Sequence, residues 1–294
     1  MENFLQFAIS GVLVGGLYSL IGMAVVLVYK STHIVSFAHG EFLAFGAFFF
    51  WILVEVFGAP VWIGLIGALA GAGIIGLLTD RIAMRPLIGE SEFTAFLMTF
   101  SVFMFLDGIY QLLLAGQARA YPPFFPQGVF GFGEVYVSQS LLICFAIAIA
   151  TFVLLGFFFK HSKKGLGLRA TAEDHRLAQS AGVSVKSIFT FVWALSAVTA
   201  AIGGIVNANV LGIYTTLPLI VFKGLVVAIF GGLDSLGGAM LAGCLLGFFE
   251  NVGAGYIDPY VGGGIRDVAA YVMLLVILLI KPYGIFGLPR IERI

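Results

Sequence analysis

Long apolar stretches separated by short polar connections run through this chain from end to end. A helix that crosses a bilayer needs about 20 mostly apolar residues, and nine stretches come close to this length or exceed it. Their ranges are 4–29, 34–57, 60–79, 93–115, 138–159, 187–213, 217–233, 236–254 and 265–281. Charged residues make up only 10% of the 294 residues, against about a quarter in a soluble domain. We therefore expect an all-α, polytopic membrane helix bundle of about eight to nine transmembrane helices.

The seventh and eighth stretches are less regular than the others. Glycine pairs at 231–232 and 237–238 interrupt them, and Lys223 lies inside the seventh. If 217–254 only dips into the bilayer, the chain has seven crossings. Because no polar stretch is long enough for a separate soluble domain, we expect residues 1–294 to form a single transmembrane domain.

The basic residues predict the orientation of the chain, since cytoplasmic connections are enriched in Lys and Arg. Alternate connections hold 12 of the 15 basic residues, and the opposite connections hold Arg119 and Arg266. The 12 are Lys30, Arg81, Arg85, Lys160, Lys163, Lys164, Arg169, Arg176, Lys186, Lys281, Arg290 and Arg293. This asymmetry places the N-terminus outside, and both the 160–186 connection and the C-terminus in the cytoplasm.

Several stretches carry glycines four residues apart, a spacing that lets helix backbones approach closely in lipid. The pairs are Gly11 and Gly15, Gly67 and Gly71, and Gly243 and Gly247. We interpret them as packing positions; a dimer face between two copies is the alternative.

Two ionisable side chains, His39 and Glu41, stand near the start of the second stretch. Such residues are costly in lipid and by default face a bundle interior or a water-filled path. On an unbroken helix they point in different directions, so both could line one cavity only if the backbone is broken near Gly40. We expect Phe37, His39 and Glu41 to line or gate a pathway. A solvated position at the cytoplasmic interface is the alternative.

Further polar residues lie in the later stretches. Asn207 and Asn209 come late in the sixth, Lys223 lies in the seventh and Glu250 in the eighth. Lys223 and Glu250 could form an ion pair. Contact with a transported solute and polar contacts between helices are equally consistent with the sequence.

The connection 160–186 predicts a short cytoplasmic helix over about 172–181. Thr171 followed by Asp174 has the spacing of a capping box, and Gly182 is a natural C-terminal stop. Small residues alternate there with charged ones, which favours docking into a cleft of a partner over lying on the bilayer surface. The candidate docking residues are Thr171, Glu173, Asp174, His175, Arg176, Ala178 and Gly182.

Catalytic and nucleotide-binding motifs are absent from the sequence. It contains no H-E-x-x-H, no G-x-S-x-G and no G-x-x-x-x-G-K-[ST]. We therefore expect a transport protein that is not an enzyme, holds no metal or cofactor, and takes its energy from a gradient or from another polypeptide.

Four segments, in this order, resemble the permease subunits of ABC importers of the branched-chain amino-acid type. They are Ile34–Glu41, Leu168–Val183, Lys223–Met240 and Lys281–Gly287. Two positions depart from the family pattern, because Asp234 stands where Gly is frequent and Gly237 stands where Pro is frequent. Both positions lie at the turn between the seventh and eighth stretches.

The resemblance implies a permease in the plasma (inner) membrane of a bacterium or archaeon. It implies a second, homologous permease subunit, two ATP-binding subunits that hold ATP and Mg, and an extracytoplasmic solute-binding protein, with no nucleic acid. The helix near 171–182 would couple ATP hydrolysis to transport of branched-chain or related small neutral amino acids. A proton-coupled carrier or channel that uses His39, Glu41 or Glu250 is the alternative.

Overall fold

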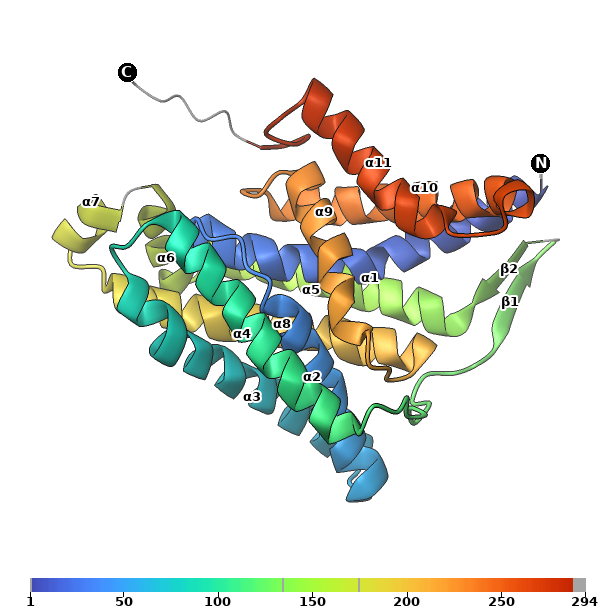
Figure 1. Ribbon diagram of the computed structural model, residues 1–294, viewed down its shortest axis with the longest axis horizontal. Helices are drawn as coiled ribbons and strands as arrows, with labels where there is room; N and C mark the ends of the chain where they lie inside the picture. The colour runs from blue at the N-terminus through green and yellow to red at the C-terminus, as the bar shows by residue number, and fades with distance from the viewer. Residues whose placement is uncertain (1, 134, 174, 288–294) are drawn as a thin grey trace.

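A computed structural model describes residues 2–133, 135–173 and 175–287 (Figure 1). Within these residues, seven helices are long and apolar enough to cross a membrane. Their spans are Asn3–Thr32, His39–Val56, Val61–Leu87, Glu92–Leu114, Gln139–His161, Val185–Leu211 and Leu236–Val261. The predicted all-α polytopic bundle is therefore confirmed.

Helix α1 (Glu2–Thr32) runs through the middle of the bundle (Figure 1). Its main neighbours are α5 (Gln139–His161), α8 (Val185–Leu211), α9 (Val221–Gly231) and α10 (Leu236–Val261). Its middle turns, which include Leu20 and Ile21, are completely buried. A helix that is apolar on all sides, as this one is, is suited to such a position.

Helices α1 and α10 meet backbone to backbone at two glycine pairs. A Cβ atom added to Gly15 would lie 2.3 Å from the carbonyl oxygen of Gly243, and one added to Gly247 would lie 2.2 Å from that of Gly11. This is the close approach that small residues four apart permit. The predicted packing role is confirmed, and these glycines face the core of their own chain, which contradicts the dimer-face alternative.

Helix α2 (His39–Trp51) starts inside the bundle, whereas the sequence predicted a helix from the first residue of the second stretch. Residues 33–38 are not helical. Part of this segment is held by α4 (Glu92–Leu114), because the amide of Phe37 donates to the hydroxyl of Thr99 at 3.4 Å. A side-chain partner for the backbone permits non-helical structure at membrane depth.

Helix α3 (Val61–Leu78) packs against α2 and α8. A Cβ atom added to Gly71 would lie 2.7 Å from the ring of Phe49, so this glycine also serves packing. The remaining turns of this part of the chain are the π-helical turns Ile52–Val56 and Thr79–Met84 and the 3-10 turn Arg85–Leu87.

A β-hairpin lies beside the N-terminal end of α1 (Figure 1), in the connection between the fourth and fifth apolar stretches. Strands β1 (Val129–Phe132) and β2 (Val135–Ser138) are antiparallel. The side-chain amide of Gln6 donates to the carbonyl of Tyr136 and accepts from its amide, both at 2.7 Å. The hairpin is thus attached to α1 by an isolated polar side chain, which carries no recognisable pattern in the sequence.

The connection 160–186 folds differently from the prediction. Helix α6 (Lys163–Glu173) begins early because the hydroxyl of Ser162 accepts from the amide of Gly165 at 2.8 Å, an N-cap that the sequence analysis missed. Thr171 therefore lies inside a helix, where its hydroxyl donates to the carbonyl of Gly167 at 2.8 Å, and the predicted capping role is wrong. The second helix, α7, covers His175–Ser180.

The seventh and ninth predicted stretches form shorter helices. A 3-10 turn, Leu217–Ile220, leads into α9, and α11 covers Ile265–Ile280. The tight turn after α9 is closed by Gly232, whose φ is +101° and whose carbonyl accepts from the amide of Ser235 at 2.9 Å. The Ser235 hydroxyl then caps α10 by accepting from the amide of Gly238 at 2.9 Å.

The crossing of α1 and α10 yields a stability prediction. Gly15→Val inserts a side chain where the two backbones touch, so we expect a loss of about 1–3 kcal/mol or more in the free energy of unfolding. Gly156→Val in α5 is the control, because a Cβ atom added there meets nothing within 4 Å. Thermal unfolding of the purified protein in detergent measures both, and equal midpoints for the two variants would contradict the close crossing.

Candidate functional site

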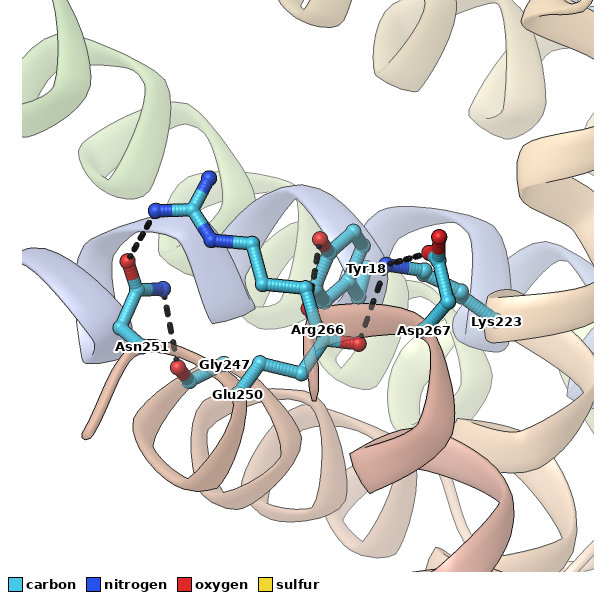
Figure 2. Close-up of polar contacts among 7 residues, drawn as sticks. All are labelled: Tyr18, Lys223, Gly247, Glu250, Asn251, Arg266 and Asp267. Carbon is cyan, nitrogen blue, oxygen red and sulfur yellow. Dashed lines mark hydrogen bonds and ion pairs between the residues drawn. The ribbon is translucent and has the colours of Figure 1, made fainter. Parts of the chain in front are cut away.

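A buried carboxylate forms the centre of a polar cluster between α1, α9, α10 and α11 (Figure 2). The side chain of Glu250, on α10, is only 1% exposed. One of its oxygens lies 3.1 Å from Nζ of Lys223 on α9, and the other accepts a hydrogen bond of 2.9 Å from the hydroxyl of Tyr18 on α1. The ion pair of Lys223 and Glu250, which the sequence left open, is therefore present, and together with Tyr18 it joins three helices.

The start of α11 brings two more charges to this cluster (Figure 2). Lys223 lies 3.3 Å from Oδ1 of Asp267, whose side chain is 80% exposed. The guanidinium of Arg266 donates to Oδ1 of Asn251 at 3.2 Å, and the amide of Asn251 donates to the carbonyl of Gly247 at 3.0 Å. The amine of Lys223 thus bridges a buried carboxylate and an exposed one.

Burial explains why these contacts form together. An ionised carboxylate withdrawn from water is stable only where a cation and hydrogen-bond donors replace the lost hydration. Glu250 receives one of each, from Lys223 and Tyr18. Lys223 also lies over the Tyr18 ring, with Nζ 5.3 Å from its centroid, a cation–π contact.

A groove of about 620 Å³ opens beside the cluster. Its polar lining includes Asn207, Tyr214, Lys223, Arg266 and Asp267, and the rest of the wall is largely aliphatic and aromatic. Asn207 is 1% exposed, and its Oδ1 has no hydrogen-bond partner within the described residues. Asn209, also singled out in the sequence, is not among the lining residues.

His39 and Glu41 are both completely buried at the start of α2. The imidazole of His39 stacks on Trp193, with ring centroids 5.9 Å apart, and neither oxygen of Glu41 has a hydrogen-bond partner in the described part of the chain. Burial contradicts the alternative that these two side chains are solvated. The backbone is non-helical at residues 33–38, before His39, but His39, Gly40 and Glu41 all lie within α2, so no break separates the two ionisable side chains.

Helix α9 connects this second group of residues to the charged cluster. Phe37 packs on Phe222, the residue before Lys223, with ring centroids 5.7 Å apart. A Cβ atom added to Gly40 would lie 2.4 Å from the carbonyl oxygen of Pro218, at the turn that leads into α9. A displacement of α9 would therefore change the contacts of both the charged cluster and the residues at the start of α2.

The connection that contains α6 and α7 lies at the opposite end of the bundle from the β-hairpin (Figure 1). Glu173 and Leu177 are exposed there, Thr171 and Ala178 are buried, and Gly182 ends the segment with a φ of +84°. The predicted stop at Gly182 is confirmed. Asp174 and the side chains of His175 and Arg176 lie outside the described residues.

Sequence reasoning missed several members of the charged cluster. Tyr18 and Asn251 lie within apolar stretches and carry no distinguishing pattern. Arg266 did carry a signal, because it is one of only two basic residues in the sparsely charged set of connections. Asp80, buried and 3.5 Å from Arg85, was also missed. Across residues 2–133, 135–173 and 175–287, no group of three His, Cys, Asp or Glu side chains could hold a metal ion.

Comparison with known proteins gives matches over nearly the whole chain. Residues 7–281 match the family model described as "Branched-chain amino acid transport system / permease component". The high-affinity branched-chain amino acid transport system permease proteins LivH of Escherichia coli (strain K12) and BraD of Pseudomonas aeruginosa are 28% and 29% identical, each over 99% of this chain and 98% of the relative. The probable branched-chain amino acid transport permease protein LivH of Methanocaldococcus jannaschii is 28% identical over 94% of this chain and 90% of its own length.

The ion pair in the cluster yields a double-mutant prediction. Lys223→Met leaves the Glu250 carboxylate buried without its cation, which we expect to cost about 3–5 kcal/mol of stability. Lys223→Met combined with Glu250→Gln removes both charges and should recover most of that loss. Thermal unfolding in detergent measures the cycle, with Lys186→Met, an exposed lysine at the start of α8, as the control. If the double variant were no more stable than Lys223→Met, the pair would not be the source of the loss.

Proposed function

Because this chain belongs to the branched-chain amino acid transport permease family, we propose that it is the membrane-spanning permease subunit of an ATP-driven (ABC) importer for branched-chain or related small neutral amino acids. The observation that carries this proposal is the family match, which extends over residues 7–281. The sequence has no nucleotide-binding motif, so the energy for transport comes from ATP-binding subunits, which hold the ATP and Mg.

The proposed assembly follows from the same family. A second, homologous permease subunit pairs with this chain in the plasma membrane of a bacterium or archaeon, and an extracytoplasmic solute-binding protein delivers the substrate. The basic residues of the 160–186 connection support a cytoplasmic position for α6 and α7, where two ATP-binding subunits dock. The N-terminus and the β-hairpin then face the outside.

Coupling to ATP hydrolysis is proposed for the α6–α7 segment. Glu173 and Leu177 are accessible to a partner there, whereas Thr171 and Ala178 are buried and support the segment from within. Asp174, His175 and Arg176 belong to the same proposal by their sequence position. Helix α6 folds back tightly on the end of α5, because a Cβ atom added to Gly165 would lie 2.6 Å from the carbonyl oxygen of Phe158. A displacement of α6 by a partner would therefore also displace α5, a membrane helix.

The substrate path is proposed to follow α2 and the segment before it, α8 and α10, along residues that are polar apart from one phenylalanine. These are Phe37, His39, Glu41, Asn207, Asn209 and Glu250. The Glu41 carboxylate and the Asn207 amide oxygen have no hydrogen-bond partner among the residues that the structure describes. Such buried polar groups are expensive in a bilayer and mark functional positions by default.

A proton-coupled carrier is the second candidate function, and one observation favours it. Glu41 is a completely buried carboxyl group whose oxygens find no partner within the described residues, as in proton relays. Family membership favours the ATP-driven importer over this alternative.

Reconstitution in liposomes tests the proposed function. We expect no leucine uptake by the purified chain alone under an imposed pH gradient, because the motor is missing. The complex with its partner permease, ATP-binding subunits and binding protein should import leucine only when ATP is present on the side of the ATP-binding subunits. Uptake by the chain alone, driven by the pH gradient, would establish the carrier instead.

The coupling segment yields a separate prediction. The charge reversal Glu173→Lys with Asp174→Lys should leave ATP hydrolysis by the assembled complex measurable while lowering leucine import per ATP at least ten-fold, because the contact that transmits motion is lost. The control is Glu55→Lys, an exposed acidic residue before α3. An unchanged ratio of import to hydrolysis in the double variant would remove the coupling role.

A further inference from the structure

We propose that the groove beside the charged cluster binds the transported amino acid as a zwitterion. In this proposal, Asn207 and Asp267 hold its ammonium group, Arg266 holds its carboxylate, and the aliphatic wall holds its side chain. The inference rests on the proposed function, because it names the site at which this permease meets its substrate, and it assigns individual groups of the substrate to individual residues.

The size and location of the groove suit this role. Its volume of about 620 Å³ falls in the range of small-molecule sites, and a small amino acid fits within it. The groove is lined by the end of α8, the turn into α9 and the start of α11. By the orientation inferred from the basic residues, these ends belong to the extracytoplasmic half of the protein, where a delivered substrate arrives.

Asn207 supplies the observation that points to a ligand. Its side chain lines the groove and is 1% exposed, yet its Oδ1 accepts no hydrogen bond from the described residues. A buried acceptor left unpaired destabilises the protein, because it has lost its hydration without replacement. A donor that enters the groove removes this cost, and the ammonium group of an amino acid carries three N–H bonds to offer.

The charges around the groove are balanced, which matters for selectivity. Lys223 and Arg266 face Glu250 and Asp267, so the cluster has two cations and two anions. Lys223 is already engaged by both carboxylates, and Glu250 is also held by Tyr18. A zwitterion adds one positive and one negative charge and so keeps the groove neutral. A ligand with a single charge would leave an uncompensated charge in a poorly solvated site.

Arg266 and Asp267 both keep free capacity for a ligand. A guanidinium has five N–H donors in a planar fork that matches a carboxylate, and the hydrogen bond of Arg266 to Asn251 uses a single nitrogen. Asp267 contacts Lys223 through Oδ1, and its side chain is 80% exposed. Neighbouring residues in the first turn of α11 thus present one positive and one negative group to the groove.

The remaining wall accounts for the class of side chain. Leu17, Leu141, Leu211 and Phe222 line the groove, with no charged residue among them. Such a surface gains roughly 25 cal/mol for each Å² of apolar area that it removes from water. It therefore favours aliphatic amino acids over polar ones.

The first experiment separates a ligand role of Asn207 from a structural one. Asn207→Leu removes a buried acceptor that has no hydrogen-bond partner in the described part of the chain, so the unfolding midpoint of the purified chain should stay the same or rise. Leucine import by the assembled complex should nevertheless fall at least ten-fold, as it should in Arg266→Gln. Arg119→Gln, the other arginine of the sparsely charged connections, lines no part of the groove and should import within two-fold of the unmodified complex.

The second experiment measures occupancy without transport. Thr216 is exposed and lines the groove, so Thr216→Cys should react with a maleimide in the assembled complex. Leucine should slow this labelling at least five-fold. Leucinamide, which lacks the carboxylate, and 4-methylpentanoic acid, which lacks the amino group, should not. The unmodified chain with its native Cys144 and Cys244 is the blank, and Gln117→Cys, exposed but outside the groove, is the control.

Several outcomes overturn the proposal. If either analogue protected Thr216→Cys as strongly as leucine does, the groove would not require both charged groups of a zwitterion. If leucine gave no protection, the groove would not be a leucine site. Normal import by Asn207→Leu, or a lowered unfolding midpoint, would end its ligand role. If the unmodified complex imports no leucine although leucine protects Thr216→Cys, the proposed function fails and the groove site stands.

Discussion

The arrangement of the charged cluster depends on the close crossing of α1 and α10. Gly15 and Gly247 let the two backbones touch, and one turn further along each helix stand Tyr18 and Glu250, which share a hydrogen bond of 2.9 Å. A side chain at either glycine would push the helices apart by more than that bond can stretch. Because lipid offers no other partner for the carboxylate, the packing of glycines decides whether Glu250 can be buried at all.

Helix α9 connects the charged cluster to the rest of the bundle. Lys223 holds it to Glu250 on α10 and to Asp267 on α11. The turn before it, at Pro218, touches Gly40 at the start of α2. An ion pair in its first turn and close backbone contact in the turn before it therefore fix this short helix against both the charged cluster and the start of α2.

The prediction of helices from the sequence was accurate where apolar length alone decides, and wrong where local hydrogen bonds decide. The long apolar stretches form the spans. Helix α2, however, begins only at His39 and not at the first residue of its stretch. The reason is that Thr99, some 60 residues later in the chain, supports a non-helical segment before it. Helix α6 begins at Lys163, earlier than predicted, because Ser162 caps it. Thr171 resembles a cap in the sequence because its spacing to Asp174 fits a capping box equally well.

The sequence by itself determined that this chain is a membrane bundle, which residues are too polar to face lipid, and that Lys223 and Glu250 could pair. These conclusions follow from composition and from the cost of charge in a bilayer, which every residue carries wherever it lies. Only the tertiary structure decided which polar residues meet. Tyr18 bonds to Glu250, and Arg266 bonds to Asn251, across helices that are distant in the sequence or separated by a turn. No local sequence pattern predicts these contacts, because they depend on how the packed helices are rotated and shifted against one another.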